Sequence, residues 1–210
     1  MTVLDIPTPV GPARVHLTGS RRARGVLVLG HGAGPSIDTV DLTATRQALA
    51  ADGWAVALVE QPWLVAGRRI AARPPVLDAA WVAVVAALRG RGAALARVPG
   101  PLLVAGRSAG ARVACRTAVA VSADAVLALS FPLHPPGRPG TSRADELLAP
   151  VKAGLPVGVV QGLRDPFGTP AELAAYLPRV VPVPGTHTIP VRAADAVATA
   201  VRQFARDLRE

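Results

Sequence analysis

The sequence predicts an α/β fold built on a mostly parallel, doubly wound sheet. Short apolar runs alternate with helical patterns from residue 26 almost to the end of the chain. These runs are continuous rather than alternating between apolar and polar residues, as in strands that are buried on both faces of a parallel sheet. A length of 210 residues is typical of one domain. We therefore expect a single domain over residues 1–210, with no inserted cap domain.

The expected strands begin with an antiparallel hairpin formed by residues 3–6 and 13–17. Pro-Val-Gly-Pro at residues 9–12 marks the turn between them. The last strand, at residues 180–183, contains Pro182, which has no backbone N–H to donate, so we place this strand at an edge of the sheet. Parallel strands are expected in between, at residues 26–29, 54–59, 102–105, 125–129 and 157–160.

Helical patterns fall between the strands. Asp78 is expected to cap the N-terminus of one helix, and Thr169 that of another, with Pro170 at its first helical position. Residues 60–75 and 131–143 are irregular and rich in Pro, Gly and Arg. Both follow strands at the edge of the sheet where ligands bind in α/β folds. The helices are expected at residues 41–51, 78–88, 109–121, 171–177 and 192–208.

The net charge of +9 does not indicate nucleic-acid binding. Lys152 is the only lysine among the 23 basic residues, which is typical of the codon usage of a GC-rich bacterial genome. The arginines are scattered apart from clusters at residues 21–24 and 68–69. Neither cluster is interleaved with aromatic residues, which make up only 3% of the chain. We therefore expect no nucleic-acid partner.

Location is indicated by the single cysteine and by the apolar runs. Cys115 cannot form an intrachain disulfide, which suits a reducing compartment. The longest uncharged apolar run, residues 79–88, is too short to span a bilayer. The N-terminal residues lack the basic and apolar regions of a secretory signal. We expect a cytoplasmic protein with no membrane partner, and the sequence leaves its oligomeric state open.

The most informative motif is Gly-Arg-Ser-Ala-Gly at residues 106–110. It lies between the apolar run at 102–105 and a small-residue helical pattern. A Gly-x-Ser-x-Gly segment between a strand and a helix is typical of a nucleophile elbow, in which a strained turn presents the serine hydroxyl at the top of the sheet. Glycine leaves room where the strand and helix backbones approach each other. Ser108 is therefore the candidate nucleophile, and it needs a neighbouring base.

Two later residues complete a possible catalytic triad. Asp165 follows the strand at 157–160, and His187, the only histidine after it, lies between the last strand and the last helix. The order Ser, Asp, His is that of the α/β-hydrolase fold. His187 would take the hydroxyl proton of Ser108, while Asp165 would hold the imidazole tautomer. The alternative interpretations are a solvated loop carboxylate for Asp165 and a loop or capping histidine for His187.

A second glycine-rich segment, Gly-His-Gly-Ala-Gly-Pro at residues 30–35, follows the first parallel strand. Backbone N–H groups of such a loop can face the oxyanion that develops during acyl transfer. We expect the oxyanion hole at the N–H groups of Ala33 and Ala109, with Gly32 as the alternative to Ala33. His31 is expected to brace the loop beside the pocket. The segment lacks the lysine and Ser/Thr of a P-loop, so we expect no nucleotide, other cofactor or metal ion.

The substrate pocket is expected to be shallow and open, bordered by residues 60–75 and 131–143. Trp63 and Phe131 are the expected apolar walls. His134 either faces the site or lies on the surface of its proline-rich loop.

Arg107 lies beside the candidate nucleophile and allows two interpretations. Its forked guanidinium could bind a carboxylate of the substrate. Alternatively, it points back into the protein and pairs with an acidic loop residue such as Glu60 or Asp165. We favour the structural pair, because the residue before an elbow serine often points inward.

Four segments together resemble a known group of proteins. They are Gly-His-Gly-Ala-Gly at 30–34, Gly-Arg-Ser-Ala-Gly-Ala-Arg at 106–112, Phe-Pro-Leu-His-Pro-Pro-Gly at 131–137 and Gly-Leu-Arg-Asp at 162–165. With them the chain resembles the small, lidless, dienelactone-hydrolase-like α/β-hydrolases. It is most similar to the hydrolase-like family named after a testis-expressed protein and a chromatin acetyltransferase subunit. Dienelactone hydrolases use a cysteine nucleophile, whereas the elbow here carries a serine.

The expected function is that of a serine hydrolase that cleaves small carboxylic esters or thioesters through an acyl-enzyme. The alternative is a non-catalytic protein-interaction module, since some animal relatives in the resembled family serve as parts of complexes. A large distance between His187 and the Ser108 hydroxyl would favour the module. A third possibility is proline- or peptide-directed hydrolysis, which an open pocket allows.

Overall fold

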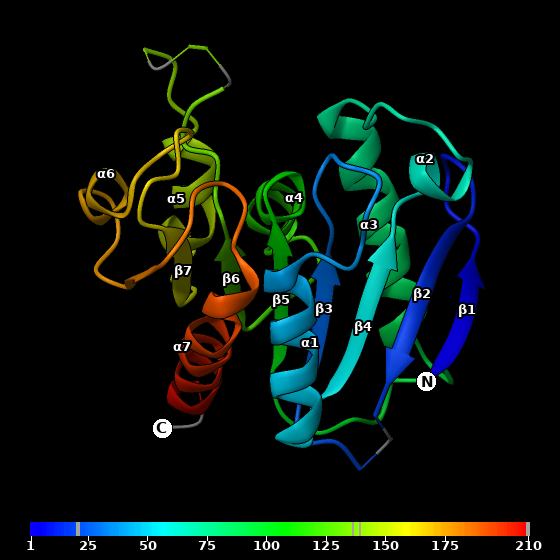
Figure 1. The fold of residues 1–210 in the computed structure, drawn as a ribbon. Helices are drawn as coiled ribbons and strands as arrows, with labels where there is room; N and C mark the ends of the chain where they lie inside the picture. Colours follow the sequence, from blue (N-terminus) through cyan, green and yellow to red (C-terminus); the bar gives the residue numbers. More distant parts are fainter. Residues whose placement is uncertain (20–21, 136, 139, 209–210) are drawn as a thin grey trace.

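A single eight-stranded sheet runs through the protein, seen in a computed structural model that describes residues 1–19, 22–135, 137–138 and 140–208 (Figure 1). The strand order is β1-β2-β4-β3-β5-β6-β7-β8. The β1–β2 and β2–β4 pairs are antiparallel, and the other pairs are parallel. The strands are β1 (Thr2–Ile6), β2 (Ala13–Thr18), β3 (Val26–Gly30), β4 (Ala55–Glu60), β5 (Leu102–Arg107), β6 (Ala125–Leu129), β7 (Val157–Gly162) and β8 (Val180–Val183).

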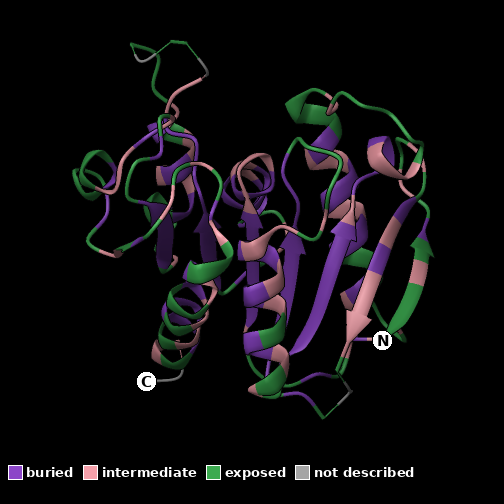
Figure 2. Ribbon diagram, in the orientation of Figure 1, coloured by how far each residue is buried: buried purple, intermediate pink, exposed green. Residues whose placement is uncertain are grey.

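Helices cover both faces of the sheet, as expected of a doubly wound fold. On one face α1 (Val40–Ala51) packs against α7 (Ala194–Asp207). The other face carries α3 (Pro74–Arg89), α4 (Ala109–Thr117) and α5 (Ala144–Lys152). The central strands are buried between these two layers, while β1 is largely exposed (Figure 2). This explains why the central strands read as continuous apolar runs.

The register of the central strands places two glycine-rich loops side by side. Gly30 at the end of β3 pairs with Gly106 near the end of β5. Both strands run in the same direction, so the segments that follow them leave the sheet at the same edge. The loop after β3 and the turn after β5 are therefore neighbours in space, although they are far apart in the sequence.

Several sequence-based expectations about the elements are confirmed. The N-terminal hairpin is present, and β8 lies at an edge of the sheet. Thr169 caps α6 (Pro170–Ala174) in a capping box with Glu172. The N–H of Val159 in β7 donates to the carbonyl of Arg179, and that of Leu163, just after β7, donates to the carbonyl of Val183. Alternate residues of β8 therefore face β7, and the backbone nitrogen of Pro182 faces away from it, where no strand needs an N–H donor.

Other boundaries differ from the expectation. Helix α3 begins at Pro74, because proline is well tolerated in the first turn, and Asp78 therefore lies inside the helix instead of capping it. Helix α4 ends at Thr117 rather than residue 121. Of the two segments expected to be irregular, residues 60–75 contain α2 (Pro62–Val65), and residues 131–143 lead into α5. Residues 136 and 139 of the second segment, and residue 21 of the first arginine cluster, lie outside the described residues.

No helix in the described part of the chain is both long and apolar enough to cross a membrane.

Candidate active site

Ser108 occupies a strained turn between β5 and α4. Its backbone has φ 54° and ψ −110°, a region that non-glycine residues rarely adopt and that costs of order 1–3 kcal/mol. The turn requires the flanking glycines. A Cβ at Gly106 would lie 2.4 Å from the carbonyl carbon of Gly110, and one at Gly110 would lie 2.5 Å from the carbonyl oxygen of Gly30. The crowding that the sequence predicts for an elbow is therefore present.

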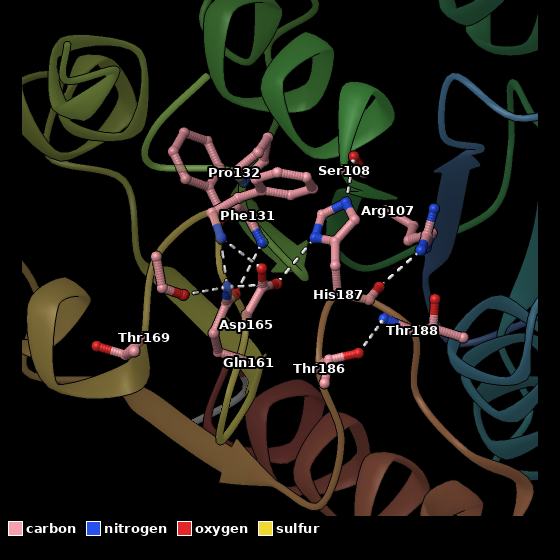
Figure 3. A network of polar contacts seen from close by, with 12 residues as sticks. Arg107, Ser108, Phe131, Pro132, Gln161, Asp165, Thr169, Thr186, His187 and Thr188 are labelled. Carbon is pink, nitrogen blue, oxygen red and sulfur yellow. Dashed lines mark hydrogen bonds and ion pairs between the residues drawn. The ribbon is translucent and has the colours of Figure 1, made fainter. Parts of the chain in front are cut away.

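The three candidate triad residues form one hydrogen-bonded chain (Figure 3). The Ser108 Oγ lies 2.9 Å from His187 Nε2, and His187 Nδ1 lies 2.8 Å from Asp165 Oδ2. In this arrangement Nδ1–H donates to the carboxylate, which leaves Nε2 to accept the hydroxyl proton. The ring of Phe167 meets the imidazole edge-on, with 4.6 Å between ring centroids. The imidazole is thus oriented from two sides.

Asp165 is buried rather than solvated, so its interpretation as a solvated loop carboxylate is wrong. It is 1% exposed, and its carboxylate accepts three hydrogen bonds. One comes from His187, one from the Phe167 N–H at 2.9 Å, and one from Gln161 Nε2 at 3.0 Å. Donors on both oxygens hold the carboxylate in one orientation.

Gln161 is a site residue that the sequence analysis missed. It is fully buried in β7. Its amide nitrogen lies within 3.2 Å of the backbone carbonyls of Phe131 and Gly168 and of the Asp165 carboxylate. Its Oε1 accepts from the Phe131 N–H at 2.8 Å. Gln161 therefore ties the loop after β6 to the loop that carries the acid. A glutamine at the end of an otherwise apolar strand was the available signal.

His31 braces the glycine-rich loop, as expected. The residue is 3% exposed, and its ring is tilted against that of Trp63, with 5.4 Å between the ring centroids. Nε2 accepts from the Gln61 N–H at 3.0 Å, so Nδ1 carries the proton and donates to the Gly32 carbonyl at 2.7 Å. Burial lowers the pKa of His31 and outweighs the opposing hydrogen bond to Gly32. The ring is consequently neutral, and both of its nitrogens are engaged within the protein.

The candidate oxyanion donors lie around the same loop. The His31 ring holds the Gly32 carbonyl, and in a trans peptide the next N–H, that of Ala33, points the opposite way. Ala109 begins α4, whose first N–H groups have no partner within the helix. Gly32 and Ala109 line one small cavity, whereas Ala33 is exposed. This arrangement keeps both Ala33 and Gly32 as candidates beside Ala109.

The expected pocket residues are not all brought to the site. Trp63 lines the small cavity that Gly32 and Ala109 border, as well as a hollow of about 180 Å³ that it shares with Leu77. Phe131 is fully buried in the core, so the prediction that it forms a pocket wall is wrong. His134 turns toward Glu172, with its Nε2 at 3.0 Å from the carboxylate, and does not join the triad.

One arginine and one cysteine lie near Ser108 in the chain. Arg107 points inward, as favoured, but its acidic partner is Asp41 at 3.4 Å rather than Glu60 or Asp165. Burial raises the pKa of the Cys115 thiol to about 12, so this cysteine is not a reactive nucleophile at neutral pH.

The sheet, with Ser108 after β5, Asp165 after β7 and His187 after β8, has the arrangement of the α/β-hydrolase fold. The sequence profile of the alpha/beta hydrolase domain family matches residues 23–191, and the chain belongs to this family. The resemblance to α/β-hydrolases that the sequence motifs indicate is thereby confirmed. A search of the curated proteins found no match.

Solved structures of bacterial proteins share the fold over nearly the whole chain. One is described as an α/β serine hydrolase without a lid, from Xanthomonas campestris, with 19% identity, a TM-score of 0.75 and coverage of 98% of this chain and 94% of that one. An α/β serine hydrolase homologue from Coxiella burnetii has 16% identity, a TM-score of 0.76 and 96% coverage of both chains. Esterase 2 from Thermogutta terrifontis, phosphorylated by paraoxon, has 15% identity, a TM-score of 0.73 and coverage of 99% and 94%.

Proposed function

We propose that the protein is a serine hydrolase that cleaves small carboxylic esters or thioesters through an acyl-enzyme. The observation that carries the proposal is the 2.9 Å contact between the Ser108 hydroxyl and His187 Nε2, with Asp165 hydrogen-bonded to the other ring nitrogen. A serine hydroxyl is a weak nucleophile at neutral pH and reacts only with a base in this position.

The proposed reaction has two half-reactions. Ser108 Oγ attacks the carbonyl carbon of the substrate while His187 accepts the hydroxyl proton, and the N–H of Ala109 with that of Ala33 or Gly32 stabilises the oxyanion. The tetrahedral intermediate expels the alcohol or thiol, which takes the proton from His187, and leaves an acyl ester on Ser108. Water then attacks this ester with His187 again as base, which releases the carboxylic acid and restores the hydroxyl.

The names of the structural neighbours support this proposal. Two are described as serine hydrolases or a homologue of one, and a third is an esterase phosphorylated by an organophosphate. The interaction-module alternative predicts a triad that is obstructed or misaligned. The short distance between Ser108 and His187 instead favours an enzyme.

Replacing the nucleophile provides the direct test. We expect Ser108→Ala to lower the hydrolysis of p-nitrophenyl acetate by several orders of magnitude, because the acyl-enzyme can no longer form. A fluorophosphonate probe should label wild type at Ser108, as read by mass spectrometry of the intact protein and its peptides. Ser122→Ala is the matched control, since Ser122 is an exposed serine with a similar φ of 52° and lies outside the site.

Equal rates for wild type and Ser108→Ala would overturn the proposal. Labelling at another residue, or no labelling, would favour the interaction module.

A further inference from the structure

Arg107 contacts the three segments that surround the elbow. It is the last residue of β5, directly before Ser108, and its side chain is 14% exposed. One nitrogen, Nη2, donates to the backbone carbonyl of His187 at 2.7 Å, a contact drawn in Figure 3. Its Nε lies 3.4 Å from Asp41 Oδ2 at the start of α1. The third nitrogen, Nη1, would lie only 2.8 Å from a Cβ at Gly32.

The contact with His187 acts on the loop that carries the candidate base. This loop runs between β8 and the short 3₁₀ helix Val191–Ala193. A backbone carbonyl held by a charged donor is fixed more firmly than one held by a neutral donor. Because the side chain of His187 must meet Ser108 and Asp165 at once, movement of its backbone changes both distances.

The guanidinium also lies beside Gly32, on the other side of the site. The guanidinium occupies the space that any side chain at this position would need, so the glycine and the arginine fit together as a pair. Gly32 lies within the loop that supplies a candidate oxyanion donor. Arg107 is therefore packed against the oxyanion loop while it holds the loop of the base.

Asp41 provides the charge that balances the guanidinium. Its side chain is 3% exposed, and Oδ1 accepts from Thr39 Oγ1 at 2.5 Å and from the Leu42 N–H at 3.0 Å. These contacts fix the carboxylate at the N-terminus of α1. The Nε–Oδ2 contact lacks hydrogen-bond geometry, so its attraction is mainly between the charges.

We propose that Arg107 is a positioning residue that holds the His187 loop and the Gly32 loop in register with Ser108, and that Asp41 holds Arg107 in place. The proposal rests on the proposed function only where it concerns catalysis, since the geometric role exists without turnover. A displacement of about 1 Å in a catalytic group can cost about 100-fold in rate. Arg107 would therefore affect kcat rather than substrate binding.

The first test is Arg107→Met, which keeps the length of the side chain but removes its donors. We expect kcat for a neutral ester to fall about 100-fold while KM changes less than about twofold. Labelling of Ser108 by a fluorophosphonate should slow in parallel. Arg192→Met is the matched control, because Arg192 is exposed just after the His187 loop and its side chain forms no hydrogen bond or ion pair with a described residue.

A second measurement does not depend on activity. The His187 Nδ1–H that bonds to Asp165 is expected to give a downfield proton NMR signal in wild type and in Ser108→Ala. We expect Arg107→Met to lose or broaden this signal, because the loop no longer holds the imidazole. If wild type neither turns over esters nor reacts with the probe, the proposed function fails, but this comparison still tests the role of Arg107.

Two further variants guard against a simple folding defect. Arg107→Lys keeps the charge, but one ammonium cannot contact both His187 and Asp41, so we expect a kcat about tenfold below wild type. Asp41→Asn keeps the Oδ1 contacts and should lower kcat with little change in KM. Wild-type kcat and an unchanged NMR signal in the folded variants would overturn the proposal. A rise in KM confined to anionic esters would also overturn it, in favour of substrate binding by Arg107.

Discussion

At the scale of single residues, the candidate acid depends on a buried amide. The two hydrogens of Gln161 Nε2 serve three acceptors within 3.2 Å, one of which is Asp165 Oδ2. All of these groups lie away from water, where an unpaired polar atom costs about 1–3 kcal/mol. Gln161 therefore contributes both to the orientation of Asp165 and to the stability of the two loops that it joins.

We predict that Gln161→Leu lowers both activity and stability. The leucine is similar in size but removes one of the three donors to the Asp165 carboxylate and the amide donor that the carbonyls of Phe131 and Gly168 share. We expect kcat to fall about 10- to 100-fold and the free energy of unfolding to fall by about 1–3 kcal/mol. Ester hydrolysis and urea unfolding provide the measurements. Gln203→Leu, an exposed change on α7, should leave both unchanged, and a Gln161→Leu enzyme with wild-type kcat would contradict the prediction.

At the scale of elements, ion pairs join the helices behind the elbow. Arg112 and Arg116 lie about one turn apart on α4, and both contact Glu146 of α5, at 2.6 Å and 2.7 Å. Arg116 also pairs with Asp78 of α3 at 2.7 Å. Burial alone would raise the pKa of Glu146, but the hydrogen bonds and charges of the two arginines outweigh it and hold the pKa below its usual value. Helix α4, which begins directly after Ser108, is thereby anchored to both neighbouring helices.

We predict that Glu146→Gln lowers the free energy of unfolding at pH 7 by about 1–3 kcal/mol, because two partly buried guanidinium groups lose their shared partner. Folding lowers the pKa of Glu146 below its usual value of 4.5. Its contribution to the free energy of unfolding is therefore fully present above pH 4.5 and is lost as the pH falls through the folded pKa. The difference between wild type and variant should therefore shrink in acid. Urea unfolding at neutral and acidic pH measures it.

Asp145→Asn is the control for this helix, since Asp145 is fully exposed in its pair with Lys152. A difference between wild type and Glu146→Gln that persists at low pH would contradict the assignment.

At the scale of the whole molecule, the site lies where segments from distant parts of the sequence meet at one edge of the sheet. The loop after β3 contributes His31 and Gly32. The turn after β5 contributes Ser108, and the loops after β7 and β8 contribute Asp165 and His187 (Figure 3). Each loop is held by buried polar contacts rather than by regular secondary structure. Conditions that charge one of these buried groups should therefore destabilise the whole fold.

We predict such an effect for His31. Burial lowers its pKa in the folded protein from 6.5, so in moderate acid the unfolded chain takes up a proton that the folded protein does not. The free energy of unfolding should fall as the pH drops from 6.5 toward the folded pKa, by at most about 1.4 kcal/mol per pH unit. Urea unfolding across this range should show the slope in wild type and a smaller slope in His31→Gln. Equal slopes would contradict the prediction.

The sequence by itself determined the α/β architecture, the elbow at Ser108 and the identities of Asp165 and His187 as candidates. Apolar periodicity reports burial locally, and parallel strands bring the segments after them to one edge, so chain order was enough to pair distant residues. The edge position of β8 also followed from one local property, the missing N–H of Pro182.

Only the tertiary structure decided which buried polar groups are partners. The pairing of Arg107 with Asp41, the role of Gln161 and the burial of Phe131 depend on which side chains arrive within a few ångströms of each other. No local pattern encodes that distance. The sequence around an arginine is the same whichever of several acidic residues it pairs with in the folded protein. The strength of each contact then depends on burial, which is a property of the packed molecule.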